Sequence, residues 1–173
     1  MIYDIQVRLA NTSDAEQVAD MSRRTFYDSF AADNSKENMD LFMEKQFPYD
    51  KLMTEVGAPG NTFLLAFLGD ELAGYAFMCE TAAPSALAGS RAIEIGRLYA
   101  EKHMIGKGVG HALMENCLKT AGEMNKNFVW LGVWERNHRA IAFYSRWGFE
   151  KFGEHIFVLG KDPQIDWWMK RKI

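Results

Sequence analysis

The sequence has few of the residues that build a disulfide scaffold or a membrane segment. It contains only two cysteines, Cys79 and Cys117. Both lie in apolar segments outside any Cys-x-x-Cys pair, so we expect packing roles rather than disulfides or a zinc site. No apolar run approaches the roughly 18 residues needed to span a bilayer. The first ten residues lack the charged start and apolar stretch of a signal peptide. We therefore expect a cytoplasmic protein with no membrane partner.

An excess of positive charge is also missing. The chain carries 20 basic and 23 acidic residues, a net charge of -3, whereas binding to nucleic acid requires a basic face. Nucleic acid is therefore not an expected partner. The four histidines show no metal-ligand spacing, so no metal is expected. An apolar fraction of 48% without repeats or linkers predicts a single globular domain over residues 1–173.

Hydrophobic periodicity predicts both strands and helices along the chain. Strands are expected at residues 4–10, 62–68, 72–80, 92–100, 128–134, 149–159 and 165–171. A capping box of Ser13 with Glu16 is expected to start the first helix, and Asn34 or Ser35 the second. A short helix can follow Pro48, and longer helices are expected after residue 108 and at 137–147. This order predicts an α/β protein with a mixed sheet flanked by helices.

A glycine cluster stands between a predicted strand and a predicted helix. Gly106, Gly108 and Gly110 allow the backbone to approach a ligand closely. The helix start supplies free N–H groups and a partial positive charge, which together suit a pyrophosphate. A dinucleotide fingerprint fails because His111 occupies the position of its last glycine, and a Walker A loop is absent. Taken alone, the cluster leaves open a turn without a ligand and a coenzyme A pyrophosphate loop.

The second motif is Asn137-His138-Arg139-Ala140-Ile141-Ala142-Phe143-Tyr144-Ser145-Arg146-Trp147-Gly148-Phe149, which reads NxxAxxFYxxxGF. With the glycine loop, it resembles the GNAT superfamily of N-acetyltransferases. The resemblance covers nearly the whole chain and is weakest in the first 60 residues. It implies a GNAT fold: a central mixed, mostly antiparallel seven-stranded sheet flanked by about four helices and splayed between strands 4 and 5. It also implies acetyl-CoA as co-substrate and a possible homodimer.

The resemblance further implies which residues contact the coenzyme. One strand would pair its backbone with the pantetheine arm, and the amides of the glycine loop would hold the pyrophosphate. Asn137 of the second motif would bond the arm, and Ala140 would leave room beside it. These residues are Leu98, Tyr99, Ala100, Gly106, Lys107, Gly108, Val109, Gly110, His111, Asn137 and Ala140. Ile105 departs from the family pattern, which has Gln or Arg there. Because the amides remain, we expect binding to persist.

Acetylation of an amine requires removal of a proton. An alkylammonium has a pKa of roughly 10.4, so only about one amine in a thousand is neutral at pH 7. The resemblance implies that the Tyr144 hydroxyl lies near the thioester sulfur and protonates the leaving thiolate; the alternative is a core tyrosine beside Phe143. Glu94 resembles the base of the histone-acetylating branch. The alternative for Glu94 is a partly solvated carboxylate or a partner of Arg97.

Two stretches narrow the resemblance to the PaiA-type polyamine N-acetyltransferases. One is residues 25–30 with Lys36-Glu37-Asn38-Met39. The other is Gly153-Glu154-His155-Ile156-Phe157 with Leu159-Gly160, and with Asp166 and Met169 beyond. The resemblance therefore implies acetyl transfer to a polyamine or another small primary amine. Acetylation of peptide N-termini or protein lysines is the close alternative. A non-catalytic coenzyme A-binding regulatory module is the alternative of another class.

Substrate contacts are expected where the first two predicted helices meet. Tyr27, Asp28 and Asp33 lie there, in the region that walls the acceptor site in the family. Carboxylates and an aromatic ring would suit the distal ammonium of a diamine. The alternative is a solvated helix end.

Overall fold

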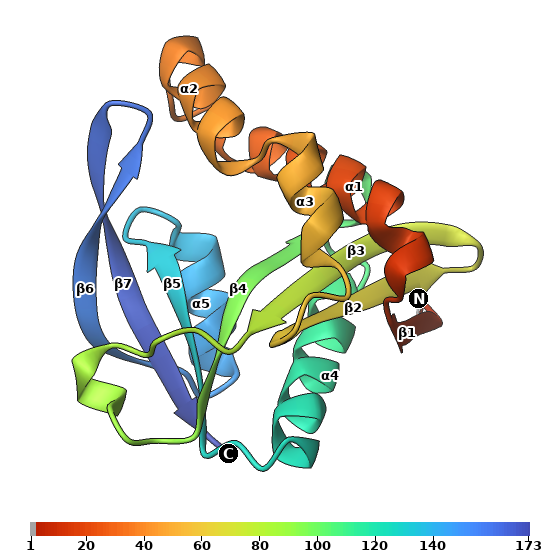
Figure 1. Ribbon diagram of the computed structural model, residues 1–173, viewed down its shortest axis with the longest axis vertical. Helices are drawn as coiled ribbons and strands as arrows, with labels where there is room; N and C mark the ends of the chain where they lie inside the picture. The colour runs from red at the N-terminus through yellow and green to blue at the C-terminus, as the bar shows by residue number, and fades with distance from the viewer. Residues whose placement is uncertain (1–2) are drawn as a thin grey trace.

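A seven-stranded mixed sheet forms the centre of the protein (Figure 1). The computed structural model describes residues 3–173. The strands are β1 (Ile5–Leu9), β2 (Asn61–Leu68), β3 (Glu71–Cys79), β4 (Ala92–Ala100), β5 (Phe128–Trp134), β6 (Glu150–Leu159) and β7 (Asp162–Lys172). Their order is β1-β2-β3-β4-β5-β7-β6, and only the β4–β5 pair is parallel. The predicted mixed, mostly antiparallel sheet is confirmed.

Five α-helices cover the two faces of the sheet in the described chain (Figure 1). They are α1 (Ala15–Phe30), α2 (Lys36–Gln46), α3 (Tyr49–Glu55), α4 (Val109–Glu123) and α5 (His138–Arg146). Side chains of α4 and α5 pack into one hydrophobic core, and those of α1, α2 and α3 form two cores on the opposite face. The short helix expected after Pro48 is α3. Burial of each helix's apolar stripe, rather than helix propensity, stabilises this arrangement.

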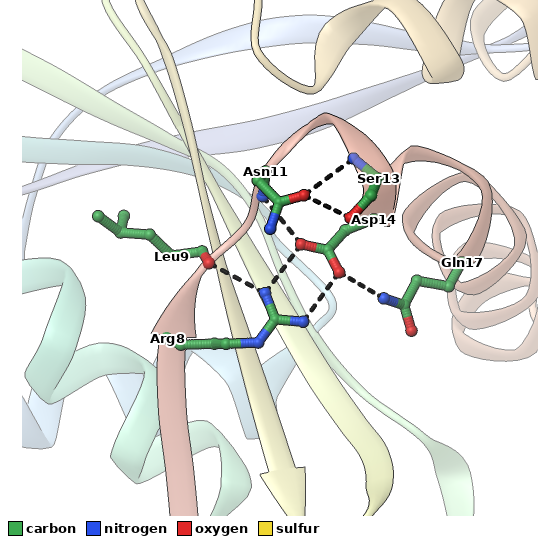
Figure 2. Close-up of polar contacts among 6 residues, drawn as sticks. All are labelled: Arg8, Leu9, Asn11, Ser13, Asp14 and Gln17. Carbon is green, nitrogen blue, oxygen red and sulfur yellow. Dashed lines mark hydrogen bonds and ion pairs between the residues drawn. The ribbon is translucent and has the colours of Figure 1, made fainter.

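The start of the first helix differs from the sequence prediction (Figure 2). The capping box is formed by Asn11 and Asp14, around a 3-10 turn (Thr12–Asp14) that leads into α1, and not by Ser13 and Glu16. Asn11 Oδ1 accepts from the Ser13 amide at 2.9 Å, and the Asn11 amide donates to Asp14 Oδ2 at 2.8 Å. The Arg8 guanidinium also donates to the Asp14 carboxylate at 2.8 Å, which lowers the pKa of Asp14 to about 2. The arginine on β1 thus favours the earlier cap.

Strands β4 and β5 separate soon after they begin. They pair at only three positions, Ala92 with Phe128, Ile93 with Val129 and Glu94 with Trp130. Beyond Glu94, β4 continues beside β3 and β5 continues beside β7, and the two strands diverge (Figure 1). Within the described residues, the β4 backbone after Glu94 has no strand partner on the β5 side. The predicted splay is confirmed, and it leaves backbone polar groups free to bind a ligand.

A largely buried ion pair, with side chains 13% and 15% exposed, fixes α3 to β4 beside the splay. Arg97 donates two hydrogen bonds to Glu55, at 2.7 and 2.9 Å, and its guanidinium lies over the rings of Phe47 and Phe77 at 5.0 and 4.8 Å. Glu94 is therefore not the partner of Arg97. The two parallel bonds and two aromatic faces hold β4 in place.

The tip of the β6–β7 hairpin is fastened to α2 and the turn before it. Gly160 packs so closely that an added Cβ would lie 2.5 Å from the Cα of Asn38, and its φ is +65°. The Lys161 amide donates to Asn38 Oδ1 at 2.9 Å, and Gln164 Nε2 donates to Asn34 Oδ1 at 2.6 Å. Only glycine fits this position without strain.

Candidate active site

A cleft of about 1390 Å³ follows the splay and continues between the α1–α2 helices and the β6–β7 hairpin. Most of the residues expected to contact ligands line it: Leu98, Tyr99, Ala100, Gly106, Gly108, Val109, Gly110, His111, Asn137, Ala140, Tyr144 and Asp28. The other expected residues are not among the lining side chains in the described chain: Lys107, Glu94, Tyr27 and Asp33. Ile105, the departure from the family pattern, also lines the cleft and is 43% exposed.

The glycine loop leads directly into α4. Gly106 and Gly108 have φ values of +87° and +91°, which favour glycine. A Cβ at either position would meet no atom within 4 Å, so the space beside them is open to a ligand. The first N–H groups of α4 lack helical acceptors and carry the positive end of the helix dipole. The Lys107 amide differs, because it donates to the Met104 carbonyl at 3.2 Å.

Helix α5 supplies the other polar groups of this half of the cleft. Asn137 caps the helix, with its Oδ1 accepting from the Ala140 amide at 3.1 Å, which leaves the Asn137 Nδ2 group available to donate. Tyr144 packs against Phe143 and Phe149 at ring distances of 5.5 and 6.0 Å. Burial, and to a lesser degree the nearby Cys117, raises the pKa of Tyr144 to about 12. The phenol therefore keeps its proton at neutral pH.

Glu94 lies beside the cleft, on the face of the sheet that carries α1–α3. Its Oε2 accepts from Thr81 Oγ1 at 2.7 Å and from the Cys79 thiol at 3.7 Å. Burial, with Glu94, raises the pKa of Cys79 to about 12, and burial raises the pKa of Cys117 to about 12. Both cysteines are free and buried. Thiols that stay protonated are poor nucleophiles, which agrees with packing roles.

The acceptor half of the cleft has aromatic walls that the sequence analysis did not identify. Phe30 of α1 meets Trp134 of β5 edge to face at 6.4 Å, and Phe157 of β6 packs on Phe42 of α2 at 5.4 Å. All four rings line the cleft. The sequence does not reveal them as a group, because the four rings lie far apart in the chain and each fits the apolar pattern of its own element.

Asp166 on β7 is a second feature that the sequence analysis missed as a site residue. It lines the cleft, and burial raises its pKa to about 6. The signal was present in the sequence, since Asp166 interrupts the apolar stretch Ile165-Asp166-Trp167-Trp168-Met169. A carboxylate inside such a strand must face water, pair with a cationic side chain or enter a site.

Residues 3–173 contain neither a metal-binding cluster nor a membrane-spanning helix. No group of three or more His, Cys, Asp or Glu side chains in that range is arranged to hold a metal ion. No helix in that range is long and apolar enough to cross a bilayer.

Comparison with known proteins identifies the family. The sequence matches the acetyltransferase (GNAT) family over residues 17–149. An uncharacterised N-acetyltransferase of Lactobacillus delbrueckii subsp. lactis, from the pepI 3' region, is 36% identical over 169 residues, 98% of each chain. A probable spermine N(1)-acetyltransferase of Bacillus subtilis subsp. natto is 33% identical over 64 residues, 36% of this chain and 42% of that one.

The fold has a counterpart among solved structures. The PaiA N-acetyltransferase of Thermoplasma acidophilum, in complex with coenzyme A, aligns with a TM-score of 0.79 at 21% identity, over 98% of this chain and 99% of that one. The family match spans both the glycine loop and the NxxAxxFY segment of the cleft. The chain belongs to the GNAT family and is an acetyl-CoA-dependent N-acetyltransferase.

Proposed function

We propose that residues 1–173 act as one domain that acetylates a polyamine or another small primary amine by direct attack in a ternary complex. The observation that carries the proposal is the continuity of the cleft. The open helix start at Gly108, the unpaired edge of β4 and Tyr144 line the same space as the aromatic walls. One cleft can therefore hold donor and acceptor together, which removes most of the entropic cost of their encounter.

The donor half fits acetyl-CoA in three places. The amides of Gly106, Gly108, Val109, Gly110 and His111 would hold the diphosphate, where glycine leaves open space and α4 presents its positive end. The free edge of β4 from Leu98 to Ala100 would pair with the amides of the pantetheine arm. Asn137 would donate its Nδ2 to the arm, and Ala140 would leave room beside it. Lys107 would contribute charge near the phosphates rather than its amide.

Tyr144 is the proposed acid. A thiol has a pKa of about 8.5, well below the value of about 12 for Tyr144. The phenol therefore stays protonated and donates a hydrogen bond to sulfur as the carbon–sulfur bond breaks. Tyr144 then transfers its proton to sulfur, while the attacking nitrogen gives up one of its own protons. The proposed base is a carboxylate, for which Glu94 and Asp166 are the candidates.

The acceptor half supports a small cationic substrate. The aromatic walls suit methylene groups and an ammonium, and Asp28 lines the cleft at the α1 side. Tyr27 and Asp33 lie near it on the exposed end of α1 and the following turn, and would meet a distal ammonium at the rim. The probable spermine N(1)-acetyltransferase of Bacillus adds support, since 64 residues of this chain match it at 33% identity.

A homodimer in the cytoplasm completes the proposal. Ile156, Val158 and Ile165 on the outer hairpin are 70%, 54% and 37% exposed, which favours burial against a second copy. The unpaired Cys79 and Cys117 fit a reducing compartment. Light scattering on the purified protein should give the mass of two copies, and the mass of one copy would contradict the dimer.

Thiol release from acetyl-CoA tests the activity directly. The purified protein is given spermidine, spermine, 1,4-diaminobutane and a lysine peptide, and kcat/KM is compared. We expect the highest values with the polyamines. Preference for the peptide would favour the protein-directed alternative, and no coenzyme release with any amine would refute the proposal.

Acetyl-CoA binding is tested by calorimetry on a matched pair of glycine variants. Gly108 and Gly89 have φ values of +91° and +78°, and a Cβ at either meets no atom within 4 Å. Gly108→Ala and Gly89→Ala therefore introduce similar backbone strain. Only Gly108 lies at the proposed diphosphate site, so only its variant should weaken binding, by about tenfold or more. Equal affinities of the two variants would contradict that site.

A further inference from the structure

Asp166 occupies a defined position in the acceptor half of the cleft. On β7 it lies directly opposite Trp134 of β5 and His155 of β6, so the three side chains share one face of the sheet. An added Cβ on Gly132 would lie 3.6 Å from Asp166 Oδ2 and 3.7 Å from His155 Cε1. The missing side chain of Gly132 thus keeps space beside the carboxylate, in the cleft that Tyr144 also lines.

The carboxylate has no compensating partner in the part of the chain that the structure describes. Burial is the one cause of its raised pKa, with no hydrogen bond or opposite charge acting on it. By contrast, the carboxylate of Glu94 accepts from Thr81 and Cys79. A half-buried carboxylate without a partner is costly to keep unless a ligand provides the partner.

Its neighbours narrow the chemistry of that ligand. The aromatic rings of Trp134 and Phe30 meet at 6.4 Å beside it. Burial is the main cause of the raised pKa of Tyr99, and Tyr144 and Asp166 each add to it, so both groups lie within electrostatic range of Tyr99. A site with one free carboxylate, aromatic walls and a nearby acid fits a primary ammonium on an apolar chain.

We infer that Asp166 is the catalytic base, which binds the acceptor's ammonium group and takes its proton before attack. The inference rests on the proposed function and adds the residue that selects and activates the amine. The side chain of Asp166 forms an O–H bond as the ammonium loses one N–H bond, which leaves a neutral amine with a free electron pair.

The remaining steps balance with Tyr144 as the acid. The amine nitrogen forms a bond to the acetyl carbon, and the carbon–sulfur bond breaks with its electron pair going to sulfur. Sulfur receives the Tyr144 proton, and the second nitrogen proton restores the phenol. The proton on Asp166 leaves to solvent, so one ammonium and one thioester give one amide, one thiol and one released proton.

The test compares kcat/KM across pH 5 to 9 with 1,4-diaminobutane as the amine. In the wild type we expect kcat/KM to fall below about pH 6, where Asp166 becomes protonated. Asp166→Asn should lower kcat/KM at pH 8 by about 100-fold or more and remove this acid limb. Its affinity for acetyl-CoA should stay within about twofold, because Asp166 lies outside the donor half.

Three further variants identify the group that titrates. Asp162→Asn makes the same change at an exposed position of β7 outside the cleft lining and should keep wild-type kinetics. His155, whose pKa burial lowers, shares the face of Asp166, and Glu94 of β4 acts on His155 electrostatically. Because Asp166 is the group that titrates, His155→Gln and Glu94→Gln should both retain the fall of kcat/KM below about pH 6. Loss of the limb in either of them, or its persistence in Asp166→Asn, would overturn the inference.

A binding measurement separates this inference from the proposed function. Calorimetry follows 1,4-diaminobutane titrated into the enzyme–coenzyme A complex, which cannot turn over. The wild type should bind the amine, and Asp166→Asn should bind it at least about tenfold more weakly. Equal binding and activity in both proteins would overturn the role of Asp166 alone. Absence of both amine binding and turnover in the wild type would overturn the proposed function together with it.

Discussion

Replacing Asp166 by Asn should stabilise the protein at alkaline pH in the absence of ligands. Burial raises the pKa of Asp166 from 3.8 in the unfolded chain to about 6 in the fold. The native state therefore holds the proton more tightly, and stability falls as pH rises between these two values. Above about pH 6 the full cost of the buried charge remains. A pKa difference of about two corresponds to about 3 kcal/mol, which the neutral amide removes.

Urea unfolding of the wild type and Asp166→Asn at pH 8 and pH 4 measures this effect. At pH 8 the variant should exceed the wild type by about 2–3 kcal/mol in unfolding free energy, or by roughly 4–12 °C in Tm. The difference should shrink toward zero at pH 4, where the native carboxyl is protonated. The exposed substitution Asp162→Asn should change stability by less than about 0.5 kcal/mol at either pH. Equal stabilities of Asp166→Asn and the wild type at pH 8 would show that the charge of Asp166 does not destabilise the fold.

Two other substitutions probe the cleft and its support. Tyr144→Phe should lower kcat by about 100-fold while leaving acetyl-CoA affinity within about twofold, because the ring still packs but no proton reaches sulfur. Steady-state kinetics measure kcat and calorimetry measures the affinity; an unchanged kcat would mean that Tyr144 is not the acid. Glu55→Gln leaves the largely buried Arg97 without its counter-charge and should lower the unfolding free energy by about 2–4 kcal/mol, somewhat less than for a fully buried pair. Denaturant titration measures this loss, and a loss under about 1 kcal/mol would show that the aromatic rings around Arg97 suffice.

The donor half of the site could be anticipated from the sequence because its parts are local. The glycine loop and the start of α4 are contiguous, and so are the cap Asn137 and Tyr144 on α5. Each motif therefore predicts its own local geometry. The splay between β4 and β5 came from the family resemblance, because strand divergence depends on pairing that no single segment encodes.

The acceptor half of the cleft could not be predicted from the sequence in the same way. Phe30, Trp134 and Phe157 belong to three elements far apart in the chain, and each fits the apolar pattern of its own element equally well as core. The capping residues were predicted wrongly for a similar reason, since Arg8 on β1 stabilises Asp14 in a contact between elements. Asp166 is different: its apolar flanks marked it as unusual, but only the fold shows that it faces the cleft.

Initial-rate kinetics with both substrates varied tests direct attack in a ternary complex most directly. We expect intersecting double-reciprocal lines, because donor and acceptor occupy one cleft and both cysteines are buried with raised pKa values. Parallel lines would mean that the acetyl group first passes to the enzyme, which would rule out direct transfer between the two substrates.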